Sequence, residues 1–202
     1  MSSSYPSLIP EHYTGEETET SSRYHAEERE QSTAVFREAF RRLKQVNKWK
    51  EWSGSLSSSF ELIDKTGSPV NGEAEVGLYI RIDIPGPGNN AGDGYDWVYI
   101  EKLEYIGVND DEEWAVMIAR PAEPPGKDET AHFLTDRATS SFVIHRDTLE
   151  VKATVLGRNE IPNTESSGIV DIVRNAIVGS SGAIGVSKLQ WKALTAGLLE
   201  TT

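Results

Sequence analysis

The stretch from residue 76 to residue 160 constrains the fold most, because its hydrophobic pattern predicts successive β-strands separated by turns. Residues 78–84 alternate apolar and polar side chains with the period of two that a half-buried strand requires. The other predicted strands are 60–64, 96–106, 113–120, 141–145 and 149–155. Because no helical segment separates these strands, we expect an antiparallel meander of about five strands.

A helical segment flanks this block on each side. An apolar stripe at spacings of three and four predicts a long N-terminal helix over residues 22–47. A second stripe predicts C-terminal helices within 167–200. The predicted fold class is therefore α+β, with the N-terminal helix and the C-terminal helices packed on one antiparallel sheet that spans residues 58–157. Residues 1–21 are polar and acidic, and we expect a disordered tail there, which leaves residues 22–202 as a single α+β domain.

Composition excludes several classes of partner. The 202-residue chain carries a formal charge of −12, with a pI near 4.8. Binding to phosphate requires clustered Lys and Arg, so we expect no nucleic-acid partner and no attraction to an anionic membrane. The absence of cysteine rules out disulfides, thiol nucleophiles and thiolate metal sites. With no signal peptide and no apolar run of membrane-spanning length, the sequence predicts a soluble, cytoplasmic protein.

Two motifs resemble nucleotide-binding signatures but lack the required context. Residues 86–91 match the G-x-G-x-x-A pattern, yet a strand follows them where the pyrophosphate site needs a helix N-terminus. Residues 145–147 spell the His-Arg-Asp triplet of kinases, but Lys152 stands where the kinase pattern needs Asn. Asn89, Asn90, Asp93 and Asp96 carry oxygen ligands without the spacing of a calcium loop. We therefore predict no catalytic residues, no metal and no cofactor.

The meander predicts where a binding site would lie. Successive loops alternate between the two ends of the sheet, so the long loops 85–95, 121–138 and 157–164 share one end, which we call the long-loop rim. The opposite, short-turn end receives only residues 107–112 and 146–147. Long loops gathered on a rigid sheet are common binding sites. The candidate rim residues are Asp93, Asp96, Arg120, His132, Arg158, Asn159 and Glu160.

The length of the strand between them separates the candidate rim residues from His145 and Arg146. His145 and Arg146 should lie about 26 Å from Arg158, at roughly 3.3 Å for each residue of the strand between them, so they belong to no common site. For Arg158 and Glu160, an ion pair or loop brace is the alternative interpretation.

Two functions are compatible with this sequence. The leading hypothesis is a non-catalytic binding or assembly module that engages a protein partner through the long-loop rim, or through the basic half of the first helix. The alternative is a small-molecule-binding or enzymatic domain with a pocket between sheet and helices. A closed apolar cavity would favour the alternative, and a filled core would favour the binding module.

Overall fold

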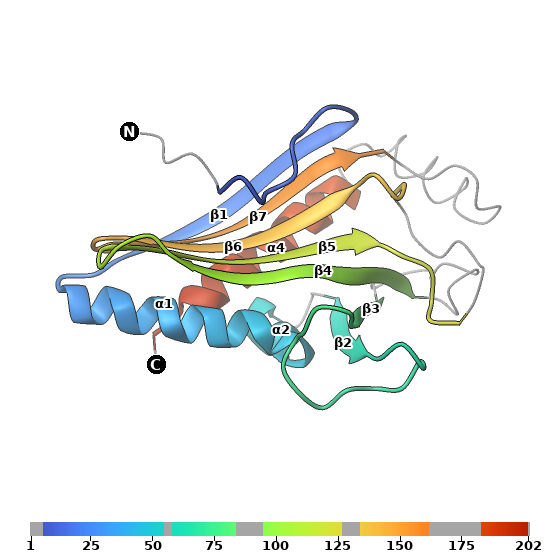
Figure 1. Ribbon diagram of the computed structural model, residues 1–202, viewed down its shortest axis with the longest axis horizontal. Helices are drawn as coiled ribbons and strands as arrows, with labels where there is room; N and C mark the ends of the chain where they lie inside the picture. Colours follow the sequence, from blue (N-terminus) through green and yellow to red (C-terminus); the bar gives the residue numbers. More distant parts are fainter. Residues whose placement is uncertain (1–5, 55–57, 84–94, 127–133, 162–182, 202) are drawn as a thin grey trace.

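The computed structural model describes residues 6–54, 58–83, 95–126, 134–161 and 183–201, with side chains of the last helix described from residue 189. Figure 1 shows one broad sheet with helices against one of its faces. The elements in chain order are β1 Glu16–His25, α1 Arg29–Lys44, a 3-10 turn Val46–Lys48, α2 Trp49–Ser53, β2 Ser59–Ile63, β3 Tyr79–Asp83, β4 Asp96–Gly107, β5 Glu112–Pro121, β6 Thr139–Asp147, β7 Glu150–Glu160 and α4 Ala183–Leu199.

The fold is α+β, with a single antiparallel sheet of seven strands in the order β1-β7-β6-β5-β4-β3-β2. Strands β2 to β7 follow one another as the predicted meander, each antiparallel to the next. The predicted count of about five strands was too low. The main addition is β1, which pairs with β7 and forms the edge of the sheet opposite β2. The first and last strands of the chain are therefore neighbours.

The N-terminal layout corrects the prediction of a tail to residue 21 and a helix from residue 22. Residues 16–25 form β1, and α1 begins only at Arg29. Hydropathy missed this strand because main-chain pairing and polar contacts hold it more than apolar burial does. Arg23 forms an ion pair with Glu150 of β7 at 2.7 Å, and the Ser22 hydroxyl lies 2.9 Å from that of Thr195 on α4. The C-terminal helices also differ in layout, with α4 at Ala183–Leu199, while residues 167–182 of that prediction lie outside the described residues.

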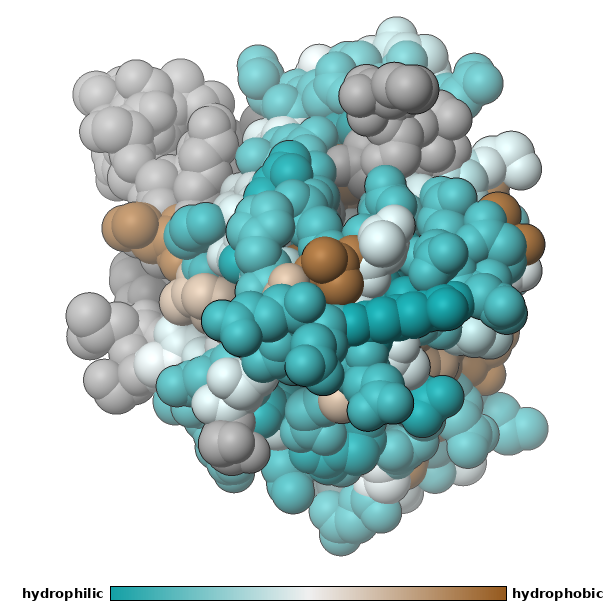
Figure 2. Space-filling view, turned by 90° about the vertical axis from the view of Figure 1, so that its left-hand side faces the viewer, coloured by the Kyte–Doolittle hydropathy of each residue, from teal (hydrophilic) through white to brown (hydrophobic). Residues whose placement is uncertain are grey.

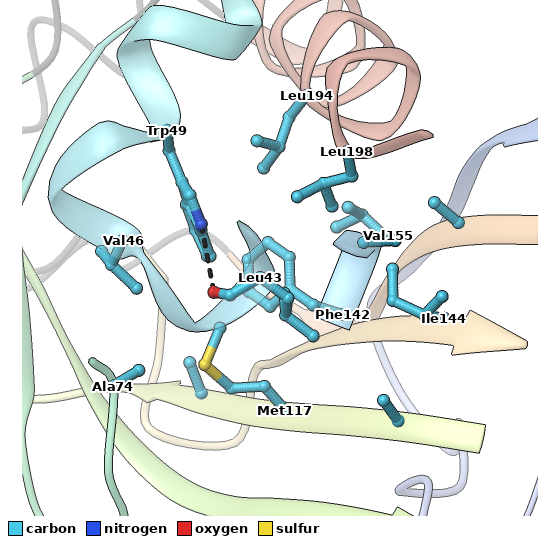
Figure 3. Close-up of a cluster of buried hydrophobic side chains, with 14 of the residues drawn as sticks. Leu43, Val46, Trp49, Ala74, Met117, Phe142, Ile144, Val155, Leu194 and Leu198 are labelled. Atoms are coloured by element: carbon cyan, nitrogen blue, oxygen red, sulfur yellow. Dashed lines mark hydrogen bonds between the residues drawn. The ribbon is translucent and has the colours of Figure 1, made fainter. Parts of the chain in front are cut away.

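The layer between the sheet and helices α1, α2 and α4 is packed with large side chains (Figure 3). Trp49 lies near its centre, with its ring centroid 4.9 Å from Phe142 and 5.3 Å from Phe60. Its indole N–H donates to the carbonyl oxygen of Leu43 at 3.2 Å, so the buried polar group is satisfied. Met117 is fully buried in this layer.

A smaller apolar cluster lies on the opposite face of the sheet. Its buried members are Trp114, Val116, Ile118, Val143 and Leu156. Leu8 and Ile9, from the segment before β1, pack against this cluster. Both faces of the central strands are therefore covered, one by helices and the other in part by the N-terminal segment. Within the described residues, no helix has both the length and the apolar character needed to cross a membrane.

Candidate functional site

Strand register brings several predicted rim residues to one end of the sheet. Asp96 begins β4 opposite Ile82, and Arg120 lies near the end of β5. Arg158 lies near the end of β7, opposite Thr139. The same register puts Asp147 opposite Glu150 at the far end, so His145 and Arg146 are separated from Arg158 as predicted. Asp93 and His132, the remaining loop candidates, lie outside the described residues.

Arg120 ties three segments of the chain together. Its Nε and Nη2 donate to the two carboxylate oxygens of Glu101 on β4, at 2.8 and 3.1 Å. Its Nη1 donates to the carbonyl oxygen of Asp136, just before β6, at 3.0 Å. This forked arrangement is the one in which guanidinium and carboxylate bind most strongly. The guanidinium is therefore engaged within the chain.

Asn159 holds the N-terminal segment against the end of β7. Its φ of 57° is in the left-handed region, which Asn tolerates better than most residues. Its Oδ1 accepts from the backbone N–H groups of Tyr13 at 2.9 Å and Thr14 at 3.2 Å, and its Nδ2 donates to the carbonyl oxygen of Glu11 at 3.0 Å. The residue is 2% exposed. Its carboxamide is thus part of an internal clamp.

Arg158 and Glu160 complete this clamp on either side of Asn159. Arg158 donates to the carbonyl oxygen of Thr18 at 3.3 Å and forms an ion pair with Glu17 at 3.1 Å. The Thr18 hydroxyl donates to Glu160 at 3.2 Å. These contacts match the brace interpretation of Arg158 and Glu160. Capture of a partner by these residues stays a prediction.

An open pocket of about 360 Å³ lies toward the same end of the sheet, at its β2 edge. Its lining residues are Asn47, Ser59, Phe60, Glu61, Asn71, Arg81, Asp83 and Tyr95. Tyr95 is the last residue of the predicted rim loop 85–95, and Asp83 lies two residues before that loop begins. The residues of β2 were not among the candidates predicted from the sequence. The available signal was topological, because the first strand of a meander lies at an edge of the sheet unless another strand pairs with it.

Part of the backbone of β2 faces outward at this pocket. The N–H of Leu62 donates to Asn47 Oδ1 at 2.7 Å, and its carbonyl oxygen accepts from Val70 at 2.8 Å, so Leu62 faces away from β3. Backbone groups alternate in direction along a strand, so those of Phe60 face outward too. Among the described residues, no partner pairs with the backbone groups of Phe60. An unpaired position of this kind is where a further strand can add.

The side chains around the pocket are charged and aromatic. Arg81 forms an ion pair with Glu61 and lies over the ring of Tyr95, with its guanidinium carbon 4.6 Å from the ring centroid. Asp83 contacts the Ser59 hydroxyl at 3.5 Å, a long hydrogen bond. Because Arg81 and Glu61 neutralise each other, Asp83 leaves the pocket with a net negative charge.

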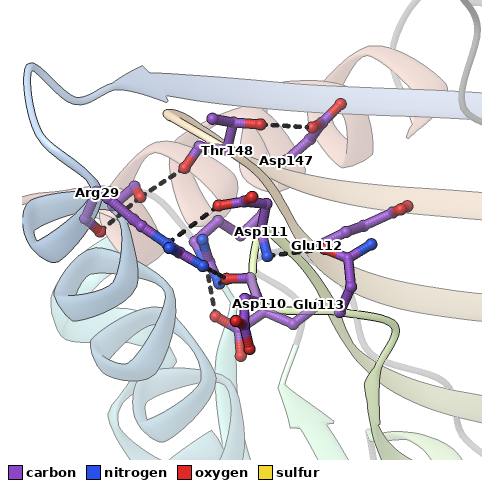
Figure 4. Close-up of polar contacts among 10 residues, drawn as sticks. Arg29, Asp110, Asp111, Glu112, Glu113, Asp147 and Thr148 are labelled. Atoms are coloured by element: carbon purple, nitrogen blue, oxygen red, sulfur yellow. Dashed lines mark hydrogen bonds and ion pairs between the residues drawn. The ribbon is translucent and has the colours of Figure 1, made fainter.

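The short-turn end is held by a polar network that joins α1 to two turns (Figure 4). Arg29 forms an ion pair with Asp111 at 3.0 Å and donates to the carbonyl oxygen of Asp110. The Ser32 hydroxyl donates to the carbonyl oxygen of Thr148 at 2.7 Å. Figure 2 looks onto this end, and its surface is mostly hydrophilic, with hydrophobic residues scattered among polar ones.

A buried ion pair lies behind these turns. Arg146, 4% exposed, donates from Nε to Glu113 at 2.6 Å and from Nη2 to the carbonyl oxygen of Asp110 at 3.0 Å. Tyr105 donates its hydroxyl to the other oxygen of Glu113 at 2.9 Å, and this bond raises the pKa of Tyr105. These residues connect β4, β5 and β6, so the arrangement is that of a structural lock.

His145 lies on the other face of the same end. Its ring stacks on Trp114 with a centroid separation of 3.5 Å, and its Nε2 is 3.3 Å from Glu112. Burial lowers the pKa of His145, and the contact with Glu112 opposes that shift. Among the residues that the structure describes, no group of three or more His, Asp or Glu side chains is placed to hold a metal ion.

Comparison with known proteins identifies no family. No family model matches the sequence, and neither does any curated protein. Distant structural likenesses exist. Norcoclaurine synthase from Thalictrum flavum is 12% identical, with a TM-score of 0.43 and coverage of 98% of this chain and 100% of that chain. Protein Ms6760 from Mycobacterium smegmatis is 14% identical, with a TM-score of 0.43 and coverage of 92% and 91%. The structure named Ara h 8.0201 is 11% identical, with a TM-score of 0.35 and coverage of 92% and 100%.

Proposed function

We propose that this chain is a non-catalytic binding module that captures an extended segment of a protein partner along β2, at the long-loop rim. The outward-facing backbone of Phe60, inside an open pocket of about 360 Å³, is the observation that carries the proposal. Extended peptides add to exposed sheet edges through main-chain hydrogen bonds, while pockets for alternate side chains supply specificity. The packed layer of side chains between sheet and helices supports a surface site over an interior one.

The chemistry of the pocket defines the partner. Asn47 and Val70 already bond to Leu62, so the available stretch of β2 backbone is short. Affinity must therefore come largely from side chains of the partner that enter the pocket. A basic side chain next to Asp83 would compensate the net negative charge there. The formal charge of −12 on the whole chain would also speed the approach of a cationic segment.

A small polar ligand in the same pocket is the second candidate. The volume of about 360 Å³ lies at the lower end of the range of ligand pockets. Its lining, however, is open and charged, whereas small-molecule sites are mostly apolar and enclose the greater part of the ligand. The same experiment therefore needs to detect both polypeptides and small molecules.

Affinity capture with the full chain as bait tests the proposal. Wild type, Asp83→Lys and Glu75→Lys are immobilised and exposed to extract from the native host, and captured species are identified by mass spectrometry. Glu75→Lys makes the same charge change at an exposed position that does not line the pocket. We expect a polypeptide that binds wild type and Glu75→Lys, and that binds Asp83→Lys at least about tenfold more weakly.

Hydrogen exchange then locates the contact. Binding of that polypeptide should slow exchange of the Phe60 amide, because the new main-chain bond would protect it. The β2 site would be wrong if the captured polypeptide slowed amide exchange in other regions and bound Asp83→Lys as tightly as wild type. Recovery of a small molecule in place of a polypeptide would favour the second candidate.

A further inference from the structure

The second half of β4 extends past the strand that pairs with it (Figure 1). β4 has twelve residues, whereas its neighbour β3 has five and pairs with residues 96–99. At the next residue, the N–H of Ile100 donates to the carbonyl oxygen of Leu78 at 2.9 Å, and the carbonyl oxygen of Ile100 accepts from Gly77 at 3.1 Å. Beyond Ile100, no segment of the described residues pairs with this side of β4. Residues 101–107 therefore form an open edge, which we call the β4 edge.

The bonding direction along the β4 edge follows from the turn after it. The N–H of Val108 donates to the carbonyl oxygen of Glu112, the first residue of β5, at 3.0 Å. The register of β4 with β5 holds without a shift over this stretch, so its other even-numbered residues also bond to β5. Because backbone groups alternate in direction, Leu103, Tyr105 and Gly107 face outward. Among the described residues, no group bonds to their backbone N–H or carbonyl groups on that side.

Exposed apolar side chains lie along the β4 edge. Tyr105 is 57% exposed, and its ring stacks on Phe40 of α1 with a centroid separation of 6.4 Å. Val108 follows the edge at one end, and Val76 lies at the other end, close to Ile100; both are exposed. Contiguous exposed apolar residues mark interaction surfaces more often than single ones do. The exposure of Tyr105 also shows that α1 leaves this edge uncovered.

A cation that has no ion pair among the described residues lies near Tyr105. Arg37 of α1 is exposed. The hydrogen bond from Tyr105 to Glu113 raises the pKa of the tyrosine hydroxyl, and the charge of Arg37 acts in the opposite direction. Arg37 also lines an open pocket of about 370 Å³ on α1. The other residues that line this pocket are Arg29, Glu30, Thr33 and Ala34. Since Arg29 is paired with Asp111, Arg37 is the cation available to a partner.

We propose that the β4 edge binds an extended acidic segment of a protein partner, which adds as a strand in line with β3 and places a carboxylate next to Arg37. Main-chain hydrogen bonds to Leu103, Tyr105 and Gly107 provide affinity, and the side chains that alternate along the segment provide specificity. This site is separate from the pocket at β2. It uses a different strand, and it prefers the opposite charge.

Local charge decides the preference for an acidic segment. The formal charge of −12 slows the approach of such a segment, but charges more than about 8 Å away are largely screened at physiological salt. Leu103 packs against the main core, so Lys102 and Glu104 point to the opposite face of the sheet, where their charges offset each other. Arg37 is therefore the charge that a segment on the helix side meets, and a basic segment would be repelled there.

Binding of defined synthetic peptides to the full chain tests the charge preference. One labelled peptide alternates Thr and Val around a central Glu, and its match carries Lys in place of that Glu. All proteins in this experiment carry Asp83→Lys, so that the pocket at β2 does not capture the Lys peptide. Fluorescence anisotropy should show the Glu peptide binding at least about tenfold more tightly than the Lys peptide. Failure of the Glu peptide to bind at about 1 mM, or equal affinities of the two peptides, would overturn the proposal.

A charge reversal on α1 tests the role of Arg37. Adding Arg37→Glu should reverse the preference, so that the Lys peptide binds more tightly than the Glu peptide. Lys50→Glu makes the same charge change at an exposed position of α2, away from the β4 edge, and should keep the original preference. A preference that survives Arg37→Glu, or that is lost equally in Lys50→Glu, would show that Arg37 does not hold the carboxylate.

Residue-resolved amide exchange tests the strand pairing. With the Glu peptide bound, exchange should slow at the outward-facing amides of the β4 edge, those of Leu103, Tyr105 and Gly107, because each gains a main-chain bond or is covered by the added strand. The amide of Phe60 should exchange as in the free chain. Slower exchange at Phe60 with no change along the β4 edge would place the peptide at β2 and overturn this site, whereas the site at β2 is tested separately by its own partner.

Discussion

The two ends of the sheet hold the chain in different ways. At the short-turn end, buried charges from β5 and β6 bind each other, and α1 is bonded to both adjoining turns. At the long-loop rim, Asn159 bonds to a peripheral segment that precedes β1, and its neighbour Arg158 forms an ion pair with Glu17 at the start of β1. The first network joins elements of the main fold. The second attaches a segment whose loss would leave the meander in place.

This difference separates sites of stability from sites available for binding. The short-turn end uses its specific side chains for internal contacts. The rim uses Arg120 and Asn159 in the same manner, but its pocket at β2 retains an outward-facing backbone and the net charge of Asp83. The proposed interface at β2 therefore lies along an edge of the sheet and depends on main-chain groups.

The largest expected effect is at the buried ion pair of the short-turn end. Arg146→Met leaves the Glu113 carboxylate buried without its cation, which should cost about 3–5 kcal/mol of unfolding free energy. For a domain of this size the melting temperature should fall by about 10 °C, at 2–4 °C for each kcal/mol. Adding Glu113→Gln removes the buried charge and should recover much of the loss. If calorimetry gives equal melting temperatures for wild type and Arg146→Met, the buried ion pair does not stabilise this end of the sheet.

A smaller effect is expected at the rim clamp. Asn159→Ala removes the carboxamide and strains the backbone at positive φ, and should cost about 1–3 kcal/mol. Asn159→Gly removes the same hydrogen bonds but tolerates that φ, so it should be the more stable of the two. Both variants should be cleaved faster by protease before residue 16. If neither melting temperature changes, the clamp contributes little, and the prediction of Asn159 as a partner-binding residue gains support.

The sequence predicted those strands and helices that a local hydrophobic pattern defines. The alternation in residues 78–84 and the apolar run 113–120 indicated the meander, and α1 was foreseen from its apolar stripe, although its start was placed too early. β1 was missed because its Thr, Ser and Glu residues carry no apolar periodicity. Its pairing with β7 joins residues more than a hundred positions apart, which local pattern does not encode.

The rim residues show the same limit at the level of a single side chain. Their place at one end of the sheet followed from counting loops along a meander. The role of Asn159 did not, because its carboxamide binds Tyr13 from 146 positions away. The pocket at β2 likewise depends on Asn47 and Tyr95, which come from a 3-10 turn and from the end of a loop. Residue type and spacing along the sequence do not predict contacts between such distant residues.

The smallest expected effect is the pH dependence from His145 at the short-turn end. Burial lowers its pKa in the folded state below the ordinary value of 6.5, so the unfolded chain takes up a proton at a higher pH than the folded chain does. The contribution of this residue to stability is complete above that ordinary value, and it decreases as the pH falls below 6.5 towards the folded-state pKa. Denaturant unfolding at about pH 8 and about pH 5.5 should therefore show a greater loss for wild type than for His145→Phe. The phenyl ring keeps the stacking on Trp114 and removes both the titrating group and its contact with Glu112. Equal losses in the two proteins would show that His145 protonates as readily in the folded chain as in the unfolded one.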